Sequence, residues 1–198
     1  MIVIQWDMLV LGPVWQIFHM LRPGELLLSG LRPASEVEPW WHWLKPTSRE
    51  RPVADAFTAR IRKDFGYGGE LWACIFIVVC LPRRFLELYT ASGPVEEGFL
   101  EYKVPTMAKI WNIPFCTDHP FLPLWLHELP QPSGSRLLNA DRIEITLEEA
   151  LREAARPDRI GIIHPHTGPF PWWFAIRPVA RLLSRSATLR AWAVRHLA

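Results

Sequence analysis

The run LWACIFIVVCL at residues 71–81 is the most apolar stretch of the chain. It follows the pair Gly68-Gly69, ends at Pro82, and is rich in β-branched side chains. Eleven apolar residues between such breakers are typical of a strand that is buried on both faces of a sheet. We therefore predict that residues 71–81 form the central strand of the fold.

Further strands are predicted on both sides of this run. Residues 85–90 and 99–104 alternate in polarity and are separated from each other by the turn at Ser92-Gly93-Pro94. The simplest interpretation joins them to residues 71–81 as three antiparallel strands. Residues 2–6 are β-branched and aromatic, and they predict another strand. Residues 22–51 give no clear element.

A helix is predicted over residues 52–65. Val53, Phe57 and Ile61 recur at four-residue spacing and place apolar side chains on one face. Pro52 suits the first position of a helix, and Gly66 suits the position just after its last residue.

Residues 105–135 hold too many prolines for a helix or a central strand and are too apolar for a free linker. We predict an irregular cover over the sheet, or a docking face for a partner.

The C-terminal part has a β-α-β pattern. Residues 142–145 and 159–163 predict strands, and Thr146 with Glu149 forms a capping box that begins a helix between them. Residues 172–197 predict a basic amphipathic helical tail. The whole order predicts one α+β domain over residues 1–198, with an antiparallel or mixed sheet that is compatible with a ferredoxin-like (split βαβ) arrangement.

The charge of the chain is divided unevenly along its length. Residues 1–158 carry 16 Lys and Arg against 20 Asp and Glu, whereas residues 159–198 carry six arginines and no acid. Such an asymmetry indicates a polyanionic partner. Arginine binds phosphate through two parallel hydrogen bonds and stacks on bases. The candidate polyanion-binding residues are Arg177, Arg181, Arg185, Arg190 and Arg195.

Three explanations of this basic tail stay open. RNA is preferred, by analogy with sheets that present aromatic side chains to RNA. Anionic lipid headgroups are the second, which would make the chain an accessory subunit that touches a membrane peripherally. The third is that acids such as Glu148, Glu149 and Glu153 pair with the arginines within the fold.

Tryptophan is strongly enriched, with 11 in 198 residues, and three of them lie together. Trp40, Trp41 and Trp43 surround His42, and so many indoles in four residues do not all fit one small core. We predict that this group stacks on bases or docks on another protein subunit.

A metal site is the weaker chemical hypothesis. His164 and His166 follow a predicted strand, and Cys116 with His119 could complete four ligands of the zinc type. The competing interpretation is a pair of loop histidines beside a proline. Cys116 near His119 and His127 could imitate a thiolate–imidazole pair, but the sequence has no established nucleophile motif and no phosphate-binding loop. We therefore prefer a non-catalytic binding subunit over a small metal-dependent enzyme.

The three cysteines, Cys74, Cys80 and Cys116, give no disulfide framework and favour a reducing intracellular compartment. The N-terminal stretch contains Asp7 and has no basic start, so it does not predict a secretion signal. The apolar run at 71–81 is about half the roughly 20 residues that a spanning helix needs.

Overall fold

The computed structural model describes residues 1–4, 8–10, 14–93, 97–123, 125 and 162–164. Its contacts divide the chain into two compact units, Met1–Gln5 with Met20–Pro123 and Trp6–His19 with Leu124–Ala198. Helices and small antiparallel sheets make up the described part, which confirms the mixed α+β class. The prediction of a single domain stays a prediction. Among the described residues, no helix is both long enough and apolar enough to cross a bilayer.

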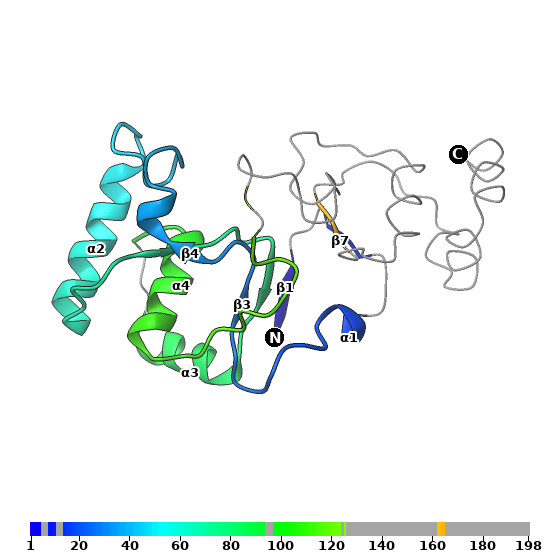
Figure 1. The fold of residues 1–198 in the computed structure, drawn as a ribbon. Helices are drawn as coiled ribbons and strands as arrows, with labels where there is room; N and C mark the ends of the chain where they lie inside the picture. Colours follow the sequence, from blue (N-terminus) through cyan, green and yellow to red (C-terminus); the bar gives the residue numbers. More distant parts are fainter. Residues whose placement is uncertain (5–7, 11–13, 94–96, 124, 126–161, 165–198) are drawn as a thin grey trace, which may run out of the picture. The chain divides into compact units, whose positions relative to one another are not determined.

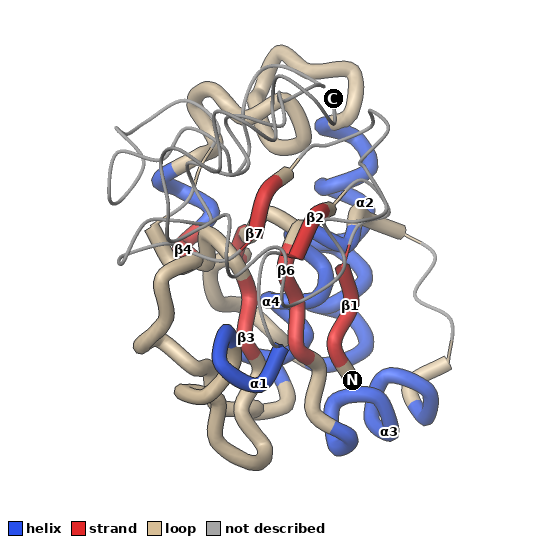
Figure 2. The backbone as a smooth tube through the Cα atoms, turned by 90° about the vertical axis from the view of Figure 1, so that its right-hand side faces the viewer, coloured by secondary structure: helices blue, strands red, loops and turns tan. Residues whose placement is uncertain are grey.

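The main sheet of the first unit has three antiparallel strands. β6 (Val78–Cys80) lies in its centre, between β1 (Ile2–Ile4) and β3 (Leu27–Leu28), as Figure 2 shows. Val79 faces Val3 on one side and Leu28 on the other. All three residues of β6 are buried, which confirms the prediction of a central, buried strand for this end of the apolar run.

The prediction of one continuous strand over residues 71–81 was wrong. The run forms β5 (Trp72–Ala73), a turn at Phe76 and Ile77, and then β6. β5 pairs with β4 (Arg32–Pro33) in a separate two-stranded sheet. The buried hydroxyl of Ser29 allows the break, because it donates to the carbonyl of Ile75 at 2.5 Å and accepts from the N–H of Val78 at 3.3 Å. Backbone groups at the break in the strand, which cannot bond to a neighbouring strand, thus still have hydrogen-bond partners.

The helix predicted at 52–65 is confirmed as α2 (Arg51–Phe65), which follows the short 3₁₀ helix η1 (Ala34–Glu36). Its inward face carries Ala54, Phe57 and Ile61. Gly66 ends the helix with φ of 63°, a left-handed conformation that glycine adopts without strain.

Residues 85–90 form a helix, and the predicted strand was wrong. α3 (Arg83–Ala91) begins after Pro82. Phe85 and Tyr89 lie one turn apart, with ring centroids separated by 5.7 Å, and both rings contact Trp111. Alternation over six residues was too short to distinguish a strand from this helical face.

Residues 99–104 were also wrongly predicted as a strand. They lead into α4 (Leu100–Ile110), which also includes the first part of the segment predicted as irregular from residue 105. Every residue from Tyr102 to Ala108 is buried, and a helix buried on all sides shows no polar periodicity in its sequence. Beyond Ile110, the described residues up to Pro123 form no further helix or named strand.

Pro105 lies inside α4 because its missing hydrogen bond is replaced. A proline cannot donate to the carbonyl four residues earlier, which here belongs to Glu101. That carbonyl instead accepts from the N–H of Cys74 at 2.8 Å. About one helical turn further along α4, the hydroxyl of Thr106 accepts a hydrogen bond from the N–H of Trp72 at 2.9 Å. The proline therefore fixes β5 and the residue after it to α4.

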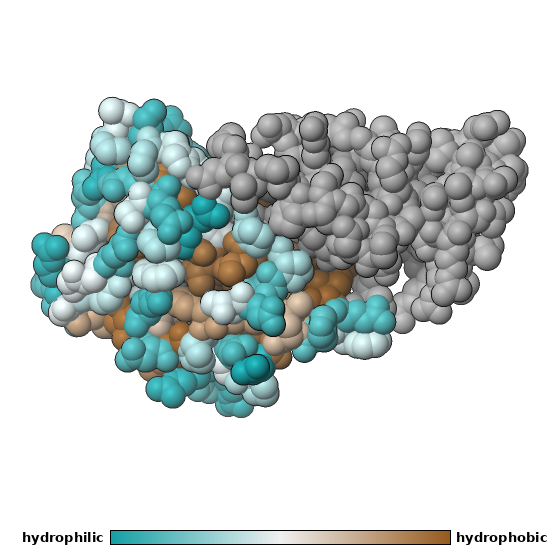
Figure 3. All heavy atoms as spheres, viewed as in Figure 1, coloured by the Kyte–Doolittle hydropathy of each residue, from teal (hydrophilic) through white to brown (hydrophobic). Residues whose placement is uncertain are grey.

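The helices of the first unit lie on one side of its main sheet. In Figure 1 the helices α2, α3 and α4 lie to the left of β1, with α4 between α2 and the strands, and in Figure 2 α4 lies behind β6. Figure 3 shows apolar residues in the middle of one face of the described part, bordered by hydrophilic ones. The fully buried core includes Leu26, Leu27, Phe57, Phe85 and Tyr102.

In the second unit, the described elements are α1 (Val14–Ile17), β2 (Leu9–Val10) and β7 (Ile162–Ile163). β7 pairs antiparallel with β2, which confirms a strand at the end of the range 159–163. The elements predicted for residues 142–154 and 172–197 lie outside the described residues.

Candidate functional site

The tryptophan cluster lies on a compact series of turns between η1 and α2. The N–H of Trp41 bonds the carbonyl of Val37 at 2.8 Å, and the carbonyl of Trp41 accepts from the N–H groups of Leu44 and Lys45 at 3.0 and 2.7 Å. Because these bonds join residues three and four positions apart, neighbouring side chains leave the segment in different directions.

The three indoles consequently have different surroundings. Trp41 is only 4% exposed and belongs to the core with Val37 and Leu44. Trp40 and Trp43 are half-buried, and His42 between them is exposed. The cluster predicted as a stacking or docking surface thus presents Trp40, His42 and Trp43, with Trp41 as its anchor.

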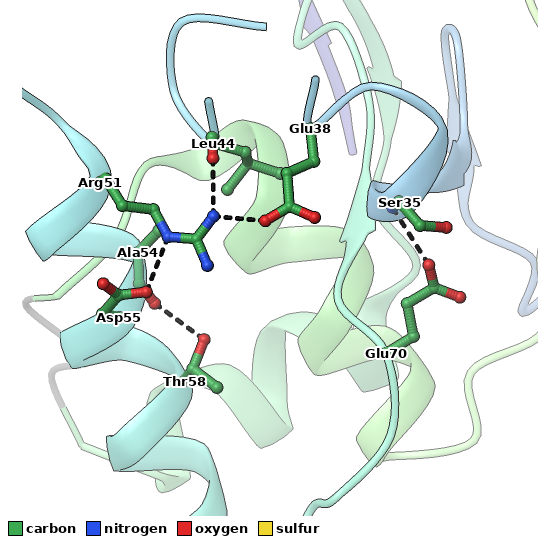
Figure 4. A network of polar contacts seen from close by, with 8 residues as sticks. All are labelled: Ser35, Glu38, Leu44, Arg51, Ala54, Asp55, Thr58 and Glu70. Carbon is green, nitrogen blue, oxygen red and sulfur yellow. Dashed lines mark hydrogen bonds and ion pairs between the residues drawn. The ribbon is translucent and has the colours of Figure 1, made fainter. Parts of the chain in front are cut away.

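Arg51 holds this segment against the start of α2, as Figure 4 shows. One guanidinium nitrogen of Arg51 donates to the carboxylate of Glu38 and to the carbonyl of Leu44, the latter at 2.9 Å. Its Nε donates to Asp55, one turn further along the helix, at 2.8 Å. The hydrogen bonds to Glu38 and Asp55 raise the pKa of Arg51 above its usual value. Arg51 is therefore a positioning residue for the tryptophan segment.

Replacing Arg51 with methionine is expected to lower the free energy of unfolding by about 1–2 kcal/mol, because the carbonyl of Leu44 and the carboxylate of Glu38 lose a charged donor. Urea unfolding and the near-ultraviolet circular dichroism of the indoles measure the effect. The matched control is Arg83→Met, which removes an exposed pair with Glu87 on α3 and should cost at most about 0.5 kcal/mol. Equal costs for the two variants would argue against a positioning role.

Cys116 and His119, proposed as metal ligands, are both buried in the first unit. His119 is 8% exposed, and neither ring nitrogen has a hydrogen bond of normal geometry in the described structure. Burial lowers the pKa of His119 to about 4, against the smaller opposing effects of the Cys116 backbone and the Asp118 carboxylate. Burial also raises the pKa of the Cys116 thiol. At neutral pH the two groups are therefore a neutral imidazole and a thiol, not an ion pair.

The other proposed metal ligands belong to the second unit. His164 is buried directly after β7, and His166 lies outside the described residues. Within the described part of the chain, no three histidine, cysteine or acidic side chains are grouped as a metal site. The zinc site with Cys116, His119, His164 and His166 stays a prediction.

The remaining cysteines are part of the core. Cys74, Cys80 and Cys116 are all free and buried. Burial raises the pKa of Cys80 to about 11 and that of Cys74 well above its ordinary value. Both side chains act as small apolar groups at neutral pH.

The arginines proposed to bind a polyanion lie outside the described residues. They are Arg177, Arg181, Arg185, Arg190 and Arg195. The functional residue that sequence reasoning missed is Arg51. A basic residue directly before Pro52, at the expected start of a helix, gave no sign of its bond to the carbonyl of Leu44.

The chain matches no known protein family, no curated protein and no solved structure. Its function must therefore be argued from its own residues.

Proposed function

We propose that this protein is a non-catalytic RNA-binding subunit of a larger assembly, with residues 172–197 as the element that contacts the phosphates. The observation that carries the proposal is the set of six arginines without any acid over residues 159–198. Arg177, Arg181 and Arg185 recur every four residues and would line one side of a helix. Each would bind a phosphate of the single-stranded RNA backbone.

The ion pairs of the first unit support this proposal. Arg51 pairs with Glu38 and Asp55, and the other described pairs also join residues close in sequence. These are Arg49 with Glu50, Arg60 with Asp64, and Arg83 with Glu87. Five carboxylates of the first unit are thus occupied by neighbouring arginines. These arginines pair with acids of their own part of the chain, whereas residues 159–198 contain no acid that could do the same for the tail.

The proposed fold of the RNA-binding subunit is a ferredoxin-like sheet with additions. Its remaining support is the sequence pattern over residues 142–163, a predicted strand, capped helix and second strand, because the strands predicted at 85–90 and 99–104 are helices. Partner subunits would bind the half-buried Trp40, because tryptophan is favoured at protein interfaces.

Binding of a fluorescent single-stranded RNA to the intact chain, measured by anisotropy over a salt series, tests the proposal. The affinity should fall steeply with salt, because each phosphate contact releases counterions. The variant Arg177→Ala/Arg181→Ala/Arg185→Ala should bind at least about tenfold more weakly and should show a shallower salt dependence.

The control variant removes the same charge from the first unit by changing the exposed Arg62, Lys63 and Arg84 to alanine. It should keep most of the affinity. An affinity that does not depend on salt, or an equal loss in both variants, would contradict the phosphate clamp. Flotation of the chain with acidic liposomes, in the absence of RNA binding, would favour the membrane-associated alternative.

A further inference from the structure

Four aromatic rings follow one another across the surface beside the tryptophan segment. The rings of His42 and Trp43 have centroids 4.1 Å apart and are tilted by 45°, and those of Trp43 and Phe99 are 3.9 Å apart and tilted by 34°. Phe99 meets Tyr102 edge to face at 6.1 Å. Tyr102 is completely buried in α4, so this row of rings connects the surface to the core.

Both faces of Trp43 are already covered. Two rings can approach the centre of a third ring to about 4 Å only from opposite faces, because an aromatic ring is roughly 3.4–3.5 Å thick. His42 and Phe99 therefore enclose the indole of Trp43 between them. A base cannot stack directly on Trp43, although the sequence singled out this residue for that role.

The open end of the row is His42. Trp43 covers one face of its imidazole, and Trp41 meets its edge at 6.4 Å and 73°. The residue is nevertheless exposed. Partial burial lowers the pKa of His42, and Glu50 opposes this effect more weakly. At neutral pH the ring is an uncharged, flat surface, already fixed by two indoles.

Basic residues lie in the turns that follow. The N–H of Lys45 bonds the carbonyl of Trp41 at 2.7 Å, which places this exposed residue one turn beyond Trp41. The side chain of Arg49 is 92% exposed and pairs with the adjacent Glu50 at 2.8 Å. An exposed pair of this kind is weak and exchanges readily for a phosphate. A flat ring followed in the sequence by exposed cations matches a nucleotide, which joins a base to a phosphate.

We propose that the outer face of His42 is a stacking position for one base of single-stranded RNA, with Lys45 and Arg49 beside the adjoining phosphates. This inference rests on the RNA-binding function proposed above and assigns a base contact to the first unit. Trp43 and Phe99 support the imidazole from behind, so that little side-chain freedom is lost when a base stacks. Histidine is among the side chains on which unstacked RNA bases lie.

The test compares His42→Ala, His42→Phe and the intact chain in binding a short single-stranded oligoribonucleotide at low salt. Loss of a stacking ring should weaken binding by about five- to a hundredfold in His42→Ala, whereas His42→Phe should retain most of the affinity. His19→Ala, which removes an exposed histidine of the second unit, is the control and should bind normally. Circular dichroism verifies that the variants are folded.

A second RNA of the same length, with abasic sugar at every position, separates base stacking from phosphate binding. His42→Ala and the intact chain should bind it equally. Normal RNA binding by His42→Ala, or the same loss on both RNAs, would overturn the stacking site and leave the RNA-binding function standing. Failure of the intact chain to bind either RNA would overturn the proposed function as well.

Discussion

Replacing Trp41 with alanine is expected to lower the free energy of unfolding by about 3–5 kcal/mol. The indole is 4% exposed and packs in the core with Val37 and Leu44, so its removal leaves a cavity. This loss is a large share of the roughly 5–15 kcal/mol that separates folded from unfolded domains. Urea unfolding followed by circular dichroism measures it.

The matched control for Trp41→Ala is Trp40→Ala, one residue earlier in the same turns. Trp40 is half-buried, so its loss removes less area from the interior and should cost about 1–2 kcal/mol. If both variants were equally stable, Trp41 would not be the anchor of the segment.

His119 is expected to make the protein sensitive to acid below neutral pH. The folded state holds this imidazole neutral down to its pKa of about 4, whereas the unfolded chain takes up a proton near the ordinary value of 6.5. Between these values the unfolded state binds more protons, so the free energy of unfolding falls as the pH falls. Above pH 6.5 this contribution is complete, and it decreases by about 3 kcal/mol on the way to pH 4.

The variant His119→Phe tests this expectation. Phenylalanine has no proton to bind and is compatible with the neighbouring ring of Phe121, whose centroid is 5.8 Å from that of His119. Stability measured by urea unfolding from pH 7 to pH 4 should decrease less in the variant than in the parent, by about 3 kcal/mol. Thr117→Ala, at an exposed neighbouring position, should follow the parent. If the free energy of unfolding fell equally with pH in the parent and in His119→Phe, burial would not lower the pKa of this histidine.

Local sequence signals predicted an element correctly where its own residues mark its beginning, its apolar face and its end. α2 was predicted correctly because Pro52 and Gly66 border a single apolar stripe. α4 was missed because burial on every side removes the stripe, and because the cost of Pro105 is offset by a bond from Cys74, which no local pattern contains. β3 has two residues, and its strand character comes from distant partners, β6 and the bridge of Leu26 to Phe115.

In the candidate site, too, the sequence predicted local features and missed those that depend on distant contacts. The tryptophans were recognisable from the sequence, but their burial was not, since the turns that orient Trp40, Trp41 and Trp43 have no regular period. The enclosure of Trp43 depends on Phe99, more than fifty positions further along the chain. The positions of the basic residues after Asp158 lie outside the described residues, so their binding role stays a prediction.

The proline in α4 also determines which parts of the first unit can come apart separately. The carbonyl of Glu101 has its hydrogen bond from Cys74 and can receive none from residue 105. Detaching β5 together with Cys74 would therefore leave that carbonyl, in the first turn of α4, without its protein donor, which is costly. We therefore expect β5 and α4 to unfold together, although about thirty residues separate them along the chain.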